Sequence, residues 1–228
     1  MHDASLIELN NAGVVCMRGG RLRISWDFFK GALELNLACE RRRTDPNAVL
    51  SKSSENFILR ARHRYQELFD SQEGEEQYLR SIPMTEIYGE DENFCHLFLF
   101  RDPLEIPNDF HDSATAPCCG LIIILNIALL EHLRNPSSPQ IISLYRLAAS
   151  LLNGKPFEAP LEVIIMNNAG VWCHQSGDTS SAEKYMNRLA TLTQGLPFNS
   201  SLTPEMIRGV YFNLGWFMNP RYKVSPAA

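Results

Sequence analysis

The chain has 228 residues, of which 45% are hydrophobic and 21% are charged, and its formal net charge is −5. This length and balance are typical of a globular protein with a substantial core. The negative charge argues against nucleic acid as the default partner, because binding to phosphates needs a basic surface.

The sequence contains neither a targeting signal nor a disulfide pattern that would be expected of a secreted protein. No basic segment followed by an apolar run stands near the N-terminus, so no secretory signal is expected. The longest apolar stretch, 121–130, is interrupted by Asn126 and is about half of the roughly 20 residues that a membrane helix needs. It predicts a buried core helix. The six cysteines form no Cys-x-x-Cys pair and are expected to be reduced, which favours an intracellular, most simply cytoplasmic, protein.

The first 40 residues predict a helix, a short turn and a second helix. Ser5 and Glu8 have the spacing of a capping box at the start of the first helix. Gly19-Gly20 supplies the turn, and an amphipathic run then reaches Leu35. The small residue Gly13 would let the second helix pack closely against the first.

Residues 40–117 are predicted to be an insertion. A helix is expected over 54–70, followed by a β-hairpin with strands at 84–88 and 94–100, and then by turn sequences around Arg101 and Ile106. Two interpretations remain. The insertion is either a flap that closes or extends a binding groove, or a piece packed on the outside to seal the break between repeats. The second is favoured.

Residues 118–218 repeat the helix–turn–helix pattern of the start of the chain. Four segments place Asn two residues before a small residue; these are 9–13, 124–128, 166–170 and 211–215. Capping signals support two of the later helices, with Ser180 and Glu183 spaced as a capping box and Thr203-Pro204-Glu205 as a helix start. Such helix pairs cannot bury their apolar faces alone, so they stack.

This order resembles the tetratricopeptide (TPR) repeat over about 1–40 and 118–218. The first repeat, about 4–39, fits closely, whereas 115 residues separate Gly13 from Ala128 in the second. The resemblance implies an all-α superhelix, a solenoid of TPR-like helix hairpins, with repeats 2 to 4 over about 118–218 and a tail over 219–228. The whole chain, 1–228, would then be a single TPR-like domain.

A second resemblance rests on three particular segments. They are Arg-Asp-Pro-Leu-x-Ile-Pro at 101–107, Asn-x-Ala-Leu-x-x-His-Leu at 126–133 and Leu-Tyr-x-Leu-Ala at 144–148. Together with the first repeat they look like a large tetratricopeptide-like family of diatoms. This resemblance implies the fold and no activity.

The TPR resemblance also implies which residues line the concave groove. The sixth repeat position is Asn in all four segments, and an amide can both donate to and accept from an extended peptide backbone. The alternative is that these amides bond within or between repeats and only shape the array. The expected groove residues are Asn11, Arg18, Asn126, His132, Asn168, His174, Gln175 and Asn213. The fifth positions carry no basic residue, so the carboxylate clamp of chaperone-binding relatives is not expected.

Other chemistry is weakly indicated. Adjacent Cys and His pairs, such as Cys173-His174, lack the ligand spacing of structural zinc, and no nucleophile elbow or phosphate-binding loop is present. We therefore expect no enzyme activity, no metal and no cofactor. The prediction is a protein–protein interaction adaptor that binds a peptide or helix in the groove. Alternatives are a nucleic-acid-binding repeat that uses the arginines of 41–64, or a structural subunit of a larger assembly.

Overall fold

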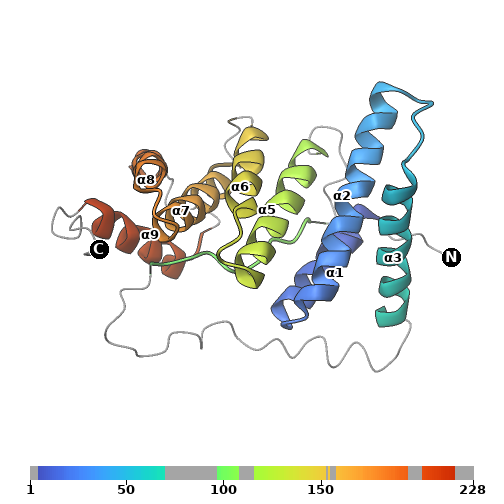
Figure 1. Ribbon diagram of the computed structural model, residues 1–228, viewed down its shortest axis with the longest axis horizontal. Helices are drawn as coiled ribbons and strands as arrows, with labels where there is room; N and C mark the ends of the chain where they lie inside the picture. Colours follow the sequence, from blue (N-terminus) through green and yellow to red (C-terminus); the bar gives the residue numbers. More distant parts are fainter. Residues whose placement is uncertain are drawn as a thin grey trace. The chain divides into compact units, whose positions relative to one another are not determined.

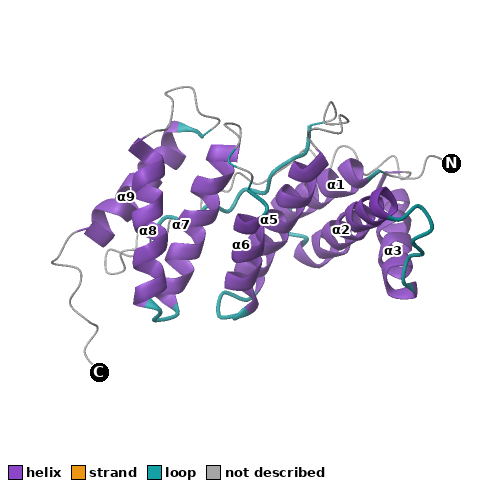
Figure 2. Ribbon diagram, turned by 90° about the horizontal axis from the view of Figure 1, so that it is seen from above, coloured by secondary structure: helices purple, strands orange, loops and turns teal. Residues whose placement is uncertain are grey.

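The computed structural model describes residues 5–69, 97–107, 116–152, 154, 158–194 and 202–218. Every regular element within these ranges is an α-helix (Figure 2), which confirms the expected all-α class for this part of the chain. The helices are α1 (Leu6–Arg18), α2 (Leu22–Thr44), α3 (Lys52–Phe69), α5 (Ala116–Arg134), α6 (Gln140–Ser150), α7 (Ala159–Gln175), α8 (Thr179–Gln194) and α9 (Pro204–Met218).

The chain divides into two compact units. Unit 1 comprises Met1–Tyr88 and Asp102–Asn135, and unit 2 comprises Gly89–Arg101 and Pro136–Ala228. The boundary falls in the turn between α5 and α6, so the helix hairpin of the expected second repeat is shared between the units. The single domain remains a prediction, and each unit is described by itself.

In unit 1, α1 and α2 form the predicted helix pair (Figure 1). Gly13 is the point of close approach, because a Cβ atom there would lie 2.6 Å from the ring of Phe29. The Ser25 hydroxyl donates a hydrogen bond of 2.8 Å to the Gly13 carbonyl in the same buried contact. Gly20, with φ of 72°, forms the turn, a conformation that favours glycine. The small residue therefore does what the repeat pattern predicted.

Helices α3 and α5 both pack on α2. A Cβ on Gly31 of α2 would lie 2.3 Å from Ala61 of α3, and one on Gly120 of α5 would lie 2.9 Å from Asn36 of α2. The helix predicted over 54–70 is confirmed as α3, and it extends the first helix pair by a third helix.

Unit 2 repeats this construction with α7 and α8. A Cβ on Gly170 would lie 2.6 Å from Met186, and Gly177, with φ of 82°, forms the turn. Helix α6 packs on α7, and α9 packs on α8. Gly215 of α9 has no such neighbour in the described residues, since nothing lies within 4 Å of a Cβ built there.

The helix starts agree with the sequence at two positions and differ at a third. Ser5 and Glu8 form the predicted capping box, and the Thr203 hydroxyl accepts from the Met206 amide at 3.3 Å. The capping box expected from Ser180 and Glu183 is wrong. Helix α8 begins at Thr179, and the Asp178 carboxylate accepts from the Ser181 amide at 3.0 Å. Hydrogen bonds from the side chain and the backbone of Ser181 lower the pKa of Asp178.

The β-hairpin expected over 84–100 is not seen. Its first strand and residues 94–96 of its second lie outside the described residues, and residues 97–100 form neither strand nor helix. None of the helices in the described ranges combines the length and the apolar character needed to cross a membrane.

Candidate functional site

Residues 97–107, called here the clamped segment, are held by the four asparagines that recur at the sixth repeat position. Each of these ladder asparagines forms two hydrogen bonds to the backbone of one segment residue. Its side-chain oxygen accepts from the N–H, and its side-chain nitrogen donates to the C=O of the same residue. The ladder asparagines are Asn11, Asn126, Asn168 and Asn213.

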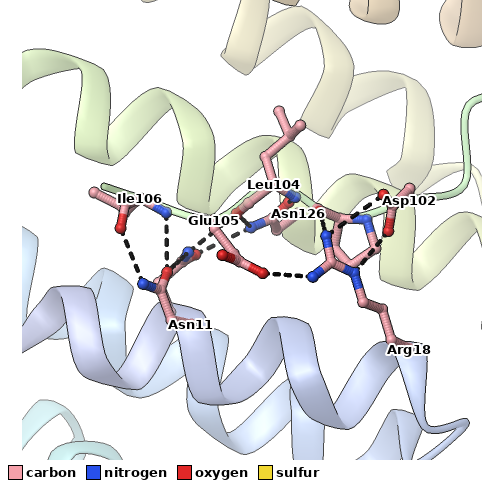
Figure 3. Close-up of polar contacts among 9 residues, drawn as sticks. Asn11, Arg18, Asp102, Leu104, Glu105, Ile106 and Asn126 are labelled. Carbon is pink, nitrogen blue, oxygen red and sulfur yellow. Dashed lines mark hydrogen bonds and ion pairs between the residues drawn. The ribbon is translucent and has the colours of Figure 1, made fainter. Parts of the chain in front are cut away.

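Unit 1 contributes two of these clamps. Asn126 of α5 binds Leu104, with 2.8 Å to its N–H and 2.7 Å to its C=O. Asn11 of α1 binds Ile106, with 2.9 Å for both bonds. Figure 3 shows the two amides pointing toward the segment from their separate helices.

Unit 2 contains the same arrangement. Asn213 of α9 binds Phe98, with 2.7 Å for both bonds, and Asn168 of α7 binds Phe100 at 3.0 Å to the N–H and 2.9 Å to the C=O. In each unit the later helix therefore binds the earlier segment residue, and the earlier helix binds the residue two positions further on.

A second amide braces each pair of clamps. In unit 1, Asn10 donates to the Leu104 carbonyl and to Asn11, and accepts from Asn126 at 3.0 Å. In unit 2, Asn167 donates to the Phe98 carbonyl and to Asn168, and accepts from Asn213 at 2.8 Å. The two triads, Asn10–Asn11–Asn126 and Asn167–Asn168–Asn213, are equivalent in sequence position and in bonding.

The clamps satisfy the backbone of a segment that has no regular structure. Buried N–H and C=O groups need partners, and here the partners are side-chain amides instead of a neighbouring strand. Clamped residues alternate with unclamped ones, as expected for an extended chain that presents one edge to the helices. Because the bonds go to the backbone, the amides do not by themselves select side chains.

In unit 1, Arg18 forms ion pairs with two acidic residues of the segment. It follows Asn11 by two turns on α1. Its Nε donates to Asp102 at 2.9 Å, its Nη2 donates to the Pro103 carbonyl at 3.3 Å, and its Nη1 bonds to Glu105. Burial alone would lower the pKa of Arg18, but the bonds and the charges of the two acids outweigh it and raise the pKa.

Apolar contacts hold the segment as well. Ile106 is fully buried and Phe100 nearly so, and the rings of Phe98 and Phe100 meet edge to face at 4.9 Å. Phe98 lies on Gly209 of α9, where a Cβ atom would come within 2.2 Å of the ring. Glycine at this position therefore makes room for an aromatic side chain.

The other predicted groove residues have different surroundings. His132 is buried in α5, and Gln175 is exposed at the end of α7. His174 packs against the rings of Trp216 and Phe217, with centroids 4.6 Å and 5.2 Å away. Burial lowers its pKa. The structure thus brings five of the eight predicted residues onto the clamped segment, namely Asn11, Arg18, Asn126, Asn168 and Asn213.

Asn10, Asn167 and Gly209 belong to the site as well. The resemblance placed the first two at the fifth repeat position without a specific role, and Gly209 was not predicted. The sequence signal for the first two was the doubled asparagine, since Asn-Asn-Ala-Gly occurs at 10–13 and again at 167–170. For Gly209 no local signal exists, because the residue it accommodates lies 111 positions earlier in the chain.

Two arginines of the predicted basic cluster over 41–64 pair with an acid within unit 1. Arg64 donates to the buried Asp27 at 3.0 Å, and Arg60 lies 3.7 Å from the same carboxylate. Among the described residues, no group of three or more His, Cys, Asp or Glu side chains is placed to hold a metal ion. Burial raises the pKa of the Cys173 thiol to about 11 and also raises that of Cys119, so both thiols are in their unreactive form at neutral pH.

No family model, curated protein or solved structure matches this chain.

Proposed function

We propose that this chain is a TPR-like helical repeat protein that binds an extended peptide through its ladder asparagines. Each unit contains the helix pairs, close glycine contacts and Gly turns from which such a superhelix is built. The function is non-enzymatic: the protein acts as an adaptor, and its partner is a segment of another protein.

One observation carries this proposal. Four side chains, from α1, α5, α7 and α9, each bond both backbone groups of one residue in an irregular segment of the chain. This is how a peptide-binding amide ladder would hold a ligand, and the chain's own residues 97–107 are bound in that manner. Four of the six triad asparagines come from the repeated Asn-Asn-Ala-Gly motif, so the amides are part of the repeat itself.

The clamped segment competes with any peptide from another molecule. Because it is tethered, its effective concentration at the clamps reaches the millimolar range or more. Binding of a partner therefore requires either that the segment leave or that it be weakened. A variant with Leu104→Pro and Ile106→Pro, here called the opened variant, removes the two N–H donors that Asn126 and Asn11 accept.

The test is selection of peptides from a phage-displayed library on the opened variant. We expect enriched peptides that bind the opened variant and fail to bind the same protein with Asn11→Ala and Asn126→Ala added. The helical circular dichroism spectrum and the melting transition check that both proteins are folded. If the folded opened variant enriches nothing, the proposed function is wrong.

If the double proline variant fails to fold, Ile106→Pro alone takes its place, since it leaves the clamp of Asn126 on Leu104 intact. The nucleic-acid alternative has less support, because Arg60 and Arg64 already pair with Asp27. That alternative requires RNA or DNA binding that weakens steeply with salt.

A further inference from the structure

We infer that the unit 1 clamp selects acidic peptides, with one carboxylate two residues before the residue held by Asn126 and another one residue after it. The inference rests on the proposed function and names the class of ligand for the same site. The pattern is an acidic residue, two residues held through their backbone, a second acidic residue and an aliphatic residue. In the clamped segment these five positions are residues 102–106, Asp-Pro-Leu-Glu-Ile.

The first step is the position of Arg18. A spacing of seven residues places it on the same face of α1 as Asn11. Its guanidinium group reaches the segment on both sides of the clamped Leu104, toward Asp102 and toward Glu105 (Figure 3). One cation therefore pairs with two carboxylates, one on each side of the residue that Asn126 fixes.

The second step is the geometry of these contacts. Arg18 approaches Asp102 with two nitrogens, Nε to Oδ1 at 2.9 Å and Nη2 to Oδ2 at 3.4 Å. A planar guanidinium in this bidentate arrangement fixes the direction of the carboxylate as well as its charge. A third nitrogen, Nη1, bonds to Glu105. A lysine or a neutral residue at either acidic position would leave part of this donor set unused.

The third step concerns the apolar positions. Asn126 and Asn11 fix the backbone of Leu104 and Ile106, and the Ile106 side chain is fully buried. Pro103, between Asp102 and Leu104, is buried and offers only its carbonyl, which Arg18 uses. The site thus combines a backbone clamp, one fully buried aliphatic side chain and one arginine that pairs with two acids, which is enough to specify a short motif.

The size of the effect follows from exposure. The Arg18 side chain is 32% exposed and its partners are 48% and 54% exposed, so solvent screens these pairs. Replacing both acids of a bound peptide by lysine should weaken its binding to the protein by about three- to tenfold at low salt. The effect should be smaller at high salt.

The test uses an opened variant that also carries Asp102→Asn and Glu105→Gln, so that its own acids do not compete for Arg18. The probe is a fluorescein-labelled peptide with the sequence of residues 101–107, blocked at both ends, and binding is followed by fluorescence polarisation. A matched peptide has lysine in place of both acids. We expect the acidic peptide to bind at least threefold more tightly, and Arg18→Glu in the protein to reverse the preference.

The outcomes separate the inference from the proposed function. Equal binding of the two peptides, or a preference that survives Arg18→Glu, overturns the inference and leaves peptide binding standing. Binding of neither peptide also overturns it, and the proposed function then rests on the library selection alone.

A second measurement needs no altered protein. Excess acidic peptide added to the wild-type chain should accelerate amide exchange of Leu104 and Ile106 by displacing them, and the lysine peptide should do so less. If both peptides accelerate exchange equally, the inference is wrong even if the substituted variant cannot be prepared.

Discussion

A side-chain amide suits the ladder positions because it carries a donor and an acceptor in one plane. An extended residue offers an N–H and a C=O that such an amide can bond together, as Asn126 does with Leu104. Aspartate would place an oxygen against the carbonyl, and leucine would leave both backbone groups unsatisfied. Losing a buried partner costs about 1–3 kcal/mol per group, which makes these positions intolerant of substitution.

Two glycines on α9 give opposite predictions for the same substitution. Gly209→Ala should destabilise the protein, because the new Cβ would meet the ring of Phe98 at 2.2 Å, and overpacking costs about 1–3 kcal/mol. Gly215→Ala should stabilise it by about 0.5–1 kcal/mol, since nothing described lies within 4 Å and alanine is the better helix former. Urea unfolding of both variants measures the two changes.

The double variant Gly209→Ala/Phe98→Ala identifies the cause. If the ring is the obstacle, its removal should reduce the effect of Gly209→Ala to that of an ordinary helix substitution. An equal penalty for Gly209→Ala with and without the Phe98 ring would show that α9 does not hold the segment in this way.

His174 predicts a pH dependence of stability. Burial lowers its pKa in the folded state below the ordinary value of 6.5, so the unfolded chain binds more protons at mildly acidic pH. The free energy of unfolding should therefore fall as pH decreases from neutral through 6.5 toward the lower folded-state pKa. His174→Phe keeps a ring against Trp216 and Phe217 and removes this contribution.

Urea unfolding at pH 7.5 and pH 5.5 compares the two proteins. The wild type should lose more stability than His174→Phe between these values. Equal losses would mean that the histidine is as accessible to protons in the folded state as in the unfolded chain.

At the scale of elements, helices and their register were predictable, and the clamped segment was not. The period of apolar residues and the small residues Gly13 and Gly170 indicate helix pairs, because these signals act between residues close in the sequence. The ladder positions followed from the same register. The segment that these asparagines bind, residues 97–107, could not be predicted in this way. Bonds such as that of Asn11 to Ile106 join residues 95 positions apart and leave no periodicity in the sequence.

The apolar run that ends at Phe100 was predicted to be a strand, and the residues around Arg101 and Ile106 were predicted to be turns. Both predictions assume that the backbone N–H and C=O groups of these residues bond to backbone groups close in the sequence. The structure supplies partners from α1, α5, α7 and α9 instead, so the described residues 97–107 are held by side-chain amides. Residues 97–107 of the predicted insertion therefore contact α5 and α1 in unit 1 and α9 and α7 in unit 2, and the two interpretations of the insertion as a whole remain predictions.

The clamped segment should show alternating amide exchange. The N–H groups of Phe98, Phe100, Leu104 and Ile106 are bonded to ladder asparagines and should exchange slowly. Those of Leu99 and Glu105 have no acceptor in the described part of the chain and should exchange faster, by about tenfold or more. Hydrogen exchange followed by NMR measures the individual rates, and uniform rates along the segment would contradict the clamp.

At the scale of the whole molecule, the same device occurs once in each unit. Asn10, Asn11 and Asn126 hold one part of the segment, and Asn167, Asn168 and Asn213 hold the other. The amide triads are built from different helices, and each bonds only residues of its own unit. Each part of the segment should therefore respond to changes in its own triad.

This independence can be measured with paired variants. Asn168→Leu should raise the exchange rate of the Phe100 amide by about tenfold or more, because a buried donor loses its acceptor, while the Ile106 amide keeps its rate. Asn11→Leu should do the reverse. Asn187→Leu, an exposed position on α8, is the matched control and should change neither. If either ladder variant accelerates both amides equally, the segment is released as one piece, and a partner that displaced it from one unit would open the other as well.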